Sequence, residues 1–447
     1  MTFDRDKTSL IGKCATLLTM FLALVVSLSA CSGSSGPVLS SQEVAQKWEM
    51  LCSNAYHDAK VKKWEEDLEY LTMQLERRHK NLYHRVSKED FAAAVANLRD
   101  ALPDLDDPGR FVEFVKLVAS VGDAHTFVSF SIPLHWFPVQ TYWFKEGVYV
   151  TAVAEEYAAL LGKRLVSIGG VATEEVYQSL IPLIAHENEA TLKSEFVNAA
   201  RCAEVLKHFG YIDGLAEGTF EFEDADGSRE AIVMKSVPNN AKINVVRLED
   251  ALGRPTTPLW KRNPKEFYWY EYVDSEKMLY FQYNTCEEDK NKPVKALTRE
   301  LMDFVDSHDV EKFVVDLRNN GGGNSRVIEP LLSALAKSEK INNKGHLFVV
   351  IGRSTFSSAI LNALTLKNNT EAIFIGEPTG GRPNHFGEVK SFNLPNSGLS
   401  VRYSTKYFRF SDDDSESLYP DILVEPSFSD LVSNTDSVLE EIRDWSP

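Results

Sequence analysis

The chain has 447 residues and a formal net charge of −17, from 48 basic and 65 acidic side chains. At about 150 residues per domain this length predicts roughly three domains. Hydrophobic residues at 43% and charged residues at 25% are typical of a globular protein, and they exclude disordered, collagen-like and multi-spanning membrane classes. The acidic balance argues against nucleic acid as the main partner, because phosphate binding requires a basic surface.

Residues 1–30 are typical of an export signal. Lys7 and Lys13 precede an apolar run at 14–28, which is short for a transmembrane helix and suits a signal-peptide core. The run leads to Cys31 and the sequence SGSSG, which resembles a bacterial lipobox. We therefore predict a diacylglycerol on the Cys31 thiol and a mature protein anchored to a membrane of the cell envelope, outside the cytoplasm. A plain secretory signal with an incidental cysteine is the alternative.

The other cysteines of the mature chain, Cys52, Cys202 and Cys286, are scattered. None has the spacing of a metal site, and three thiols form at most one disulfide. The sequence therefore predicts no metal, no cofactor and no disulfide scaffold.

Residues 31–40 are predicted to form a tether, and residues 41–122 an α-helical N-terminal domain. Apolar residues recur there at three- and four-residue spacing, as at Trp64, Leu68, Leu71 and Leu75. Ser87 is a candidate helix cap.

Residues 123–240 read as a β-rich module. Segments at 139–144 and 147–154 are rich in β-branched and aromatic residues, and 220–237 is typical of a hairpin. Residues 265–447 then alternate between strand and helix, which predicts an α/β domain with a mainly parallel sheet. We expect strands at 278–284, 311–318, 345–353 and 372–378, and helices at 294–308, 327–337 and 357–366.

Three segments contain candidate catalytic groups. The first, 316–323, has the sequence DLRNNGGG and ends a strand in three glycines. Glycines let backbone N–H groups point at a ligand, as an oxyanion hole requires. A tight strand-to-helix turn is the alternative, and a phosphate loop is disfavoured because Asn324-Ser325-Arg326 replaces the expected Gly-Lys-Ser/Thr.

The second segment, 352–359, has the sequence GRSTFSSA and places serines at a helix N-terminus, where developing negative charge is favoured. Simple helix capping is the alternative. The third, 121–126, has the sequence VGDAHT, in which His125 is a candidate general base or a structural histidine.

The order of these segments, with LGKRLVSIGG at 161–170, GEPTGG at 376–381 and YPDI at 419–422, resembles the tail-specific and tricorn-type serine peptidases of the C-terminal processing superfamily. The resemblance implies a crotonase-like β/α catalytic core and a PDZ-like module at 123–240 that holds an extended peptide by strand addition. It also implies peptide-bond hydrolysis with no metal.

Carried over by motif, the resemblance implies Ser357 as the nucleophile and His125 as the base. It implies that the oxyanion is bound by backbone N–H groups of Gly321, Gly322 and Ser358.

The sequence departs from the family in three places. Arg382 stands where the Ser/Lys branch has its lysine, and arginine is a poor base. Ile360 stands three residues after the proposed nucleophile, where the family often has a glutamate. The acid that orients the base is open among four residues before Pro420, namely Asp412, Asp413, Asp414 and Glu416, or these form a solvated loop; Asp414 and Glu416 are retained as candidates. His385 is a rival base.

These features predict a serine-type endopeptidase that acts on a peptide or protein substrate through an acyl-enzyme. A catalytically inactive, membrane-tethered protein that binds peptide or cell-wall material is the alternative. A small-molecule acyl hydrolase would share the chemistry.

Overall fold

The computed structural model describes residues 41–129, 134–254, 256–412 and 414–446. The predicted signal, Cys31 and the tether lie outside this part of the chain. Among the described residues, no helix combines the length and the apolar composition needed to cross a membrane.

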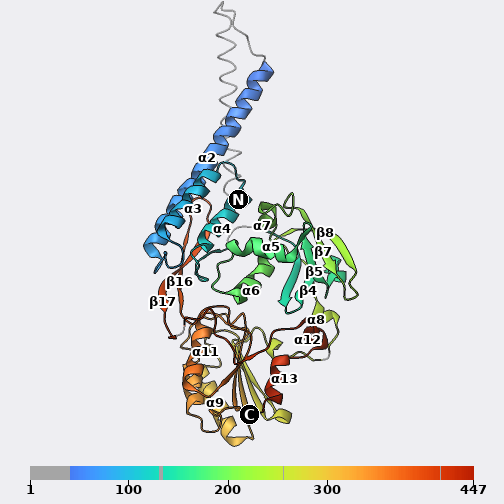
Figure 1. The fold of residues 1–447 in the computed structure, drawn as a ribbon, viewed down its shortest axis with the longest axis vertical. Helices are drawn as coiled ribbons and strands as arrows, with labels where there is room; N and C mark the ends of the chain where they lie inside the picture. The colour runs from blue at the N-terminus through green and yellow to red at the C-terminus, as the bar shows by residue number, and fades with distance from the viewer. Residues whose placement is uncertain (1–40, 130–133, 255, 413, 447) are drawn as a thin grey trace, which may run out of the picture.

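Three helices form the N-terminal part: α2 (Ser41–Arg78), α3 (Lys88–Ala101) and α4 (Asp107–Ala119). Ser87 caps α3, as predicted, because its side chain accepts a hydrogen bond from the Asp90 N–H at 3.0 Å. The C-terminal half of α2 buries its apolar stripe, whereas its N-terminal half projects beyond α3 and α4 (Figure 1).

A seven-stranded antiparallel sheet follows, in the order β10-β4-β5-β7-β8, with β3 beside β4 and β6 beside β5. Its strands are β3 (Val139–Phe144), β4 (Gly147–Ala154), β5 (Arg164–Ile168), β6 (Val171–Ala172), β7 (Glu217–Glu223), β8 (Arg229–Lys235) and β10 (Val245–Arg247). The predicted hairpin is confirmed as β7 and β8. Helices α5 (Thr173–Leu180), α6 (Glu189–Ala199) and α7 (Ala203–His208) lie between β6 and β7 in the chain, and β2 (His135–Trp136) pairs with β9 (Val237–Pro238).

The C-terminal part contains a six-stranded sheet in the order β11-β12-β13-β14-β15-β18. The edge strand β11 is antiparallel to β12 and the other neighbours are parallel, which confirms the mainly parallel sheet. The strands are β11 (Tyr268–Val273), β12 (Met278–Tyr283), β13 (Lys312–Asp316), β14 (Leu347–Ile351), β15 (Ile373–Gly376) and β18 (Ile422–Leu423). They read as continuous apolar runs because both faces of the sheet are buried.

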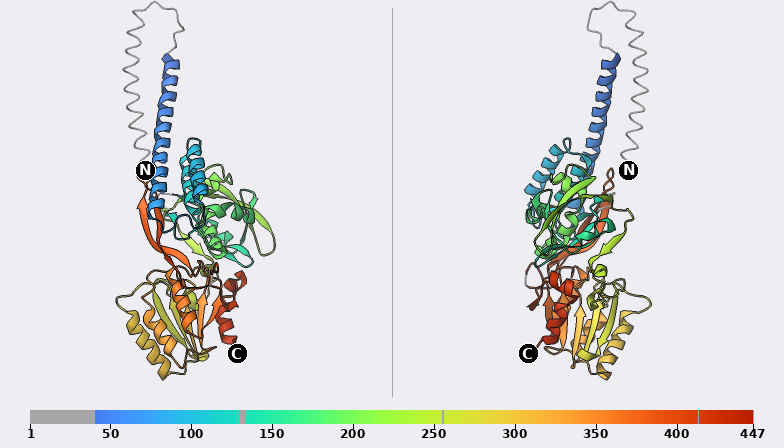
Figure 2. Two further views of the ribbon diagram at one scale, coloured as in Figure 1. Left: turned by 60° about the vertical axis from the view of Figure 1, so that its left-hand side comes forward. Right: turned by 90° about the vertical axis from the view of Figure 1, so that its right-hand side faces the viewer.

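Helices cover both faces of this sheet (Figure 2). One face packs against α9 (Val294–Ser307), α10 (Glu329–Lys337) and α11 (Ser358–Asn369). The other packs against α13 (Ser437–Asp444), which follows the short helix α12 (Phe428–Ser433). The mixed α/β class expected from the sequence is therefore confirmed.

One hairpin leaves the C-terminal part and joins the N-terminal helices. Strands β16 (His385–Asn393) and β17 (Ser400–Phe408) pair with each other, and β17 pairs with β1 (Phe127–Ser129). The hairpin runs up to α2 (Figure 1), where Asp67 accepts a hydrogen bond from the Asn396 N–H at 2.8 Å. The predicted domain that begins at residue 265 did not include this crossing of the hairpin to the N-terminal helices. The crossing brings the start of β16 close to the segment before β1.

Candidate active site

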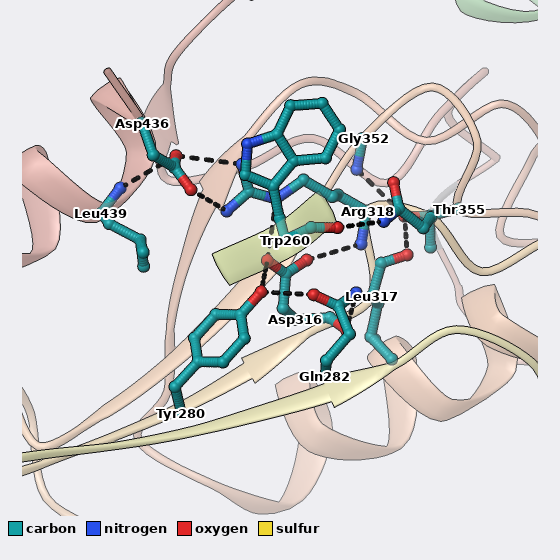
Figure 3. A network of polar contacts seen from close by, with 11 residues as sticks. Trp260, Tyr280, Gln282, Asp316, Leu317, Arg318, Gly352, Thr355, Asp436 and Leu439 are labelled. Carbon is teal, nitrogen blue, oxygen red and sulfur yellow. Dashed lines mark hydrogen bonds and ion pairs between the residues drawn. The ribbon is translucent and has the colours of Figure 1, made fainter. Parts of the chain in front are cut away.

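The turn between β14 and α11 holds Ser357 in a strained conformation. Its φ and ψ are 54° and −123°, and positive φ is uncommon for a residue with a side chain. Thr355 fixes the turn, because its hydroxyl donates to the Leu317 carbonyl at 2.9 Å and accepts from the Gly352 N–H at 3.0 Å (Figure 3). Ser357 stands at the N-cap of α11 but makes no side-chain capping bond. The capping alternative therefore does not account for its side chain.

The glycine loop lies directly against this turn. Gly322 has a φ of 105°, and a Cβ built on it would lie 2.8 Å from the Ser357 Cβ and 3.1 Å from the Ser358 nitrogen. The Asn320 carbonyl accepts a hydrogen bond from the Phe356 N–H at 3.0 Å. The two loops predicted to form an oxyanion hole therefore meet, and only glycine fits at position 322.

The three predicted oxyanion donors are not equivalent. The Gly322 N–H donates to Asn320 Oδ1 at 2.9 Å, so in this structure that amide already has an acceptor within the loop. Ser358 begins α11, and the first N–H groups of a helix have no intrahelical acceptor. Gly321 lines a cavity beside the turn. The amides of Gly321 and Ser358 therefore remain the candidate donors.

A buried ion network holds the base of the glycine loop (Figure 3). Asp316, at the end of β13, accepts hydrogen bonds from the Tyr280 hydroxyl at 2.7 Å and from Arg318 Nε at 2.8 Å. The Arg318 guanidinium donates two bonds to Asp436, at 3.0 and 3.1 Å, and lies 5.3 Å from the Trp260 ring centroid. This network joins the loop to the segment before α13.

His125 stacks on the residue before the serine. Its ring lies 4.4 Å from the Phe356 ring and 5.5 Å from the His385 ring, centroid to centroid, with interplanar angles of 21° and 11°. Both ring nitrogens of His125 are buried without a hydrogen-bond partner. Burial lowers the pKa of His125 to about 4. The imidazole is therefore neutral near pH 7, and its nitrogens are unoccupied.

These features agree with what the comparisons found. Residues 277–424 match the sequence profile of Peptidase family S41. Among solved structures, the chain is similar to mature CPAF, at 14% identity over 86% of this chain and 96% of that chain, with a TM-score of 0.62. It is also similar to mature CPAF complexed with lactacystin, at 12% identity over 86% and 99%, with a TM-score of 0.60. Likeness at this identity shows a shared fold, and no curated protein matches the sequence.

The S41 assignment confirms the predicted serine peptidase family. The matched residues include the glycine loop, the Ser357 turn and His385, whereas His125 lies outside them. The arrangement therefore combines an S41 segment with an imidazole from the region that precedes it.

The acids proposed to orient the base lie away from it. Asp414 is exposed, and one of its oxygens lies 3.4 Å from the Arg382 guanidinium. Glu416 is also exposed, and its carbonyl accepts a bond from Asn188 at 2.8 Å. Neither carboxylate bonds His125, since neither ring nitrogen has a hydrogen-bond partner.

Asp123 is the acid that sequence reasoning missed. It is fully buried, and its oxygens accept bonds from His79 Nε2 at 3.0 Å, the His125 N–H at 2.9 Å and the Thr126 hydroxyl at 2.6 Å. Burial alone would raise its pKa, but these bonds and the nearby imidazole of His125 hold that pKa well below its usual range. Asp123 Oδ1 lies 3.9 Å from His125 Nδ1. The signal was present in the sequence, because Asp123 stands two residues before His125.

His385, the rival base, lies behind His125 in the stack. It is buried, and its Nδ1 bonds to the Arg382 carbonyl at 2.9 Å. That contact makes Nδ1 the donor, and burial lowers the pKa of the ring. His385 therefore contacts His125 rather than the serine turn.

A mostly apolar cavity of about 410 Å³ opens beside the S41 glycine loop and the serine turn. Gly321, Ser354 and Phe356 line one side of it, and the opposite side includes Phe111 and Trp136. Arg353, in the same turn, donates to the Trp143 carbonyl at 2.7 Å and to Glu377 at 3.0 Å. The serine turn is thus attached both to strand β3 and to the end of β15.

Proposed function

We propose that this protein is a serine-type endopeptidase that hydrolyses peptide bonds through an acyl-enzyme on Ser357. The observation that carries the proposal is the meeting of three chain segments at the Ser357 turn. The turn is strained, the glycine loop lies against it, and a neutral imidazole is stacked on its Phe356. A nucleophile, amide donors and a base are the groups that acyl transfer needs.

In the proposed reaction, His125 accepts the Ser357 proton while Oγ attacks the scissile carbonyl carbon. The N–H groups of Gly321 and Ser358 stabilise the tetrahedral oxyanion. The imidazolium then protonates the leaving amine, and the peptide C–N bond breaks. Water, deprotonated by the same imidazole, attacks the acyl carbon and releases Ser357.

Asp123 is the carboxylate placed to stabilise the imidazolium, at 3.9 Å from Nδ1. Orientation of the base by Asp414 or Glu416, which are both exposed, would require that carboxylate to move toward His125. A large loss of kcat in Glu416→Gln with an unchanged melting temperature would show that this movement takes place.

The substrate is expected to be a peptide held between the β-rich module and the catalytic part. We propose that 123–240 acts as a PDZ-like module, that 265–447 has a crotonase-like core, and that the apolar cavity beside Gly321 accepts a substrate side chain. We also propose that Cys31 carries the lipid that tethers the enzyme to the cell envelope. Metabolic labelling with a palmitate analogue tests the last point, with Cys31→Ser as the control.

The experiment that tests the function is labelling of the mature protein by a fluorophosphonate probe, with casein hydrolysis measured in parallel. Ser357→Ala should lose both signals. Ser307→Ala is the control, because it removes an exposed hydroxyl at the end of α9, outside the site, and should keep both. Full activity in Ser357→Ala would exclude this serine as the nucleophile.

One observation favours the alternative, an inactive peptide-binding lipoprotein: no hydrogen bond orients the His125 ring. Such a protein would bind peptide without reacting with the probe.

A further inference from the structure

A second cavity, of about 500 Å³, lies beside His385. Its lining includes His385, Arg382, Glu187 and Asp414, together with Lys80 and Arg85 from the segment between α2 and α3. Ser357, His125 and the glycine loop do not line it. The cavity is therefore separate from the proposed site of peptide cleavage, although the two share the histidine stack.

The cavity gathers positive charge in a chain whose net charge is −17. Lys80, Arg85 and Arg382 face it, against the carboxyl groups of Asp414 and Glu187. Asp414 is exposed and offsets Arg382 at 3.4 Å. Lys80 and Arg85 are exposed, and within the described ranges no salt bridge pairs either of them.

Arg85 is held in place by packing. A Cβ built on Gly122 would lie 2.7 Å from the Arg85 Cδ, so the aliphatic part of this side chain lies directly on the backbone of the segment that carries Asp123 and His125. The lack of a side chain at position 122 allows this close contact. The stem of Arg85 thus packs on this backbone, while the residue as a whole is exposed and lines the cavity.

Glu187 cancels little of this charge below neutral pH. It is buried, and its Oε2 accepts a hydrogen bond from the Arg382 N–H at 3.0 Å. Burial raises the pKa of Glu187 to about 7. The carboxyl is therefore largely neutral at pH 6, where it places little negative charge against Lys80 and Arg85.

We propose that this cavity binds a small oxyanion, with the chemistry of a phosphate or a carboxylate, between Lys80, Arg85 and Arg382. Arginine offers paired donors to such oxygens and lysine adds a point charge. The volume is within the range of small-molecule sites. The aromatic rings of Phe386 and Tyr407 also line the cavity, so an organic group on the anion has an apolar surface to contact.

An anion at this position would lie against His385, whose ring is stacked on His125. Negative charge there favours the protonated form of both imidazoles. Under the proposed function, bound anion would therefore move the acid limb of the activity profile to higher pH. The binding itself does not depend on that function.

The test is calorimetric titration of the mature protein at pH 6.5 with inorganic phosphate and with acetate, at ionic strength held constant with sodium chloride. At least one anion should bind with one site per chain and raise the melting temperature. Arg85→Gln and Lys80→Gln should each weaken binding by tenfold or more, and Glu187→Gln should strengthen it. Arg99→Gln, which removes an exposed cation from α3 outside the cavity, is the matched control and should bind normally.

Binding of phosphate without acetate would assign the site to phosphate groups, and the reverse would assign it to carboxylates. Equal effects of chloride, or unchanged binding in a folded Arg85→Gln variant, would overturn the proposal. Because the readout needs no catalysis, loss of the proposed peptidase function would leave the result interpretable. Arg85→Lys keeps the positive charge and should retain part of the affinity. It distinguishes a loss of binding caused by the lost charge from one caused by misfolding.

Discussion

The serine side and the histidine side of the candidate active site are held in different ways. The serine turn is joined to the segment of the glycine loop by two hydrogen bonds, from the Thr355 hydroxyl to the Leu317 carbonyl and from the Phe356 N–H to the Asn320 carbonyl. The Asp316–Arg318 network holds the base of the loop. His125 is held by stacking on two rings, and both ring nitrogens are free of hydrogen bonds. Hydrogen bonds therefore hold the nucleophile and the oxyanion donors in position, whereas only stacking on neighbouring rings holds the imidazole of the base.

Removing the base tests this difference most strongly. His125→Ala should lower kcat/KM on a peptide substrate by about 10²- to 10⁴-fold, the usual contribution of general acid–base catalysis. The serine turn and the glycine loop should keep their arrangement in this variant, because the hydrogen bonds of the glycine loop do not involve the imidazole. Steady-state kinetics measures the effect.

The control is His308→Ala, an exposed imidazole at the end of α9. It should keep full activity. Equal activity in His125→Ala and the native protein would remove this histidine from the mechanism.

A smaller loss is expected where the serine turn meets the glycine loop. Gly322→Ala places a Cβ 2.8 Å from the Ser357 Cβ on a backbone with a φ of 105°, so the turn must shift. We expect a loss of kcat of about 10- to 10³-fold, comparable to losing an oxyanion donor, and a lower free energy of unfolding by about 1–3 kcal/mol.

Gly321→Ala is the matched variant for this prediction. No atom lies within 4 Å of a Cβ there, and φ is not positive. It keeps its N–H and should lose less than about tenfold in kcat. Equal losses in the two variants would contradict the assigned packing. Chemical denaturation and initial rates give both quantities.

The serine side of the site was largely predictable from the sequence. Residues 316–323 and 352–359 each follow a buried parallel strand, and parallel strands bring their carboxyl ends to one edge of a sheet. The occupied Gly322 N–H was not predictable, because it depends on the side-chain rotamer of Asn320. Spacing shows that a glycine loop exists, but not which amide is free.

The next expected effect concerns the stability supplied by Asp123. Its pKa is held low in the folded protein, so its contribution is present above the unfolded pKa of about 3.9 and is lost as the pH falls below that value. Asp123→Asn should lower the free energy of unfolding by about 2–3 kcal/mol at pH 7, since bonds to a buried charge are lost. The difference should shrink by pH 3.

Urea denaturation at the two pH values measures this difference. Asp414→Asn, at an exposed carboxylate, is the control and should change stability by less than about 0.5 kcal/mol. A constant deficit in Asp123→Asn from pH 7 to pH 3 would mean that packing, rather than charge, is responsible.

The histidine side was only partly predictable. His125 was identified by its motif, but its surroundings come from four distant segments: α2 supplies His79 just past its end, α4 leads to Asp123, β14 leads to Phe356, and β16 begins at His385. The crossing of the β16–β17 hairpin to the N-terminal helices creates this arrangement, and periodicity within one segment does not report it. The acids near Pro420 were favoured by chain order, whereas the carboxylate beside the imidazole is two residues away in the sequence.

The smallest predicted effect separates the two histidines. Burial, with a smaller contribution from positive charge on His385, lowers the pKa of His125 to about 4 against the opposing charge of Asp123. The acid limb of kcat/KM should therefore lie near pH 4 rather than near 6.5. His385→Phe keeps a ring in the stack and removes that charge. The acid limb should therefore move to higher pH while the plateau rate is unchanged. A plateau lowered as far as in His125→Ala would make His385 the base, and an acid limb that stays near pH 4 would show that burial alone sets the pKa of His125.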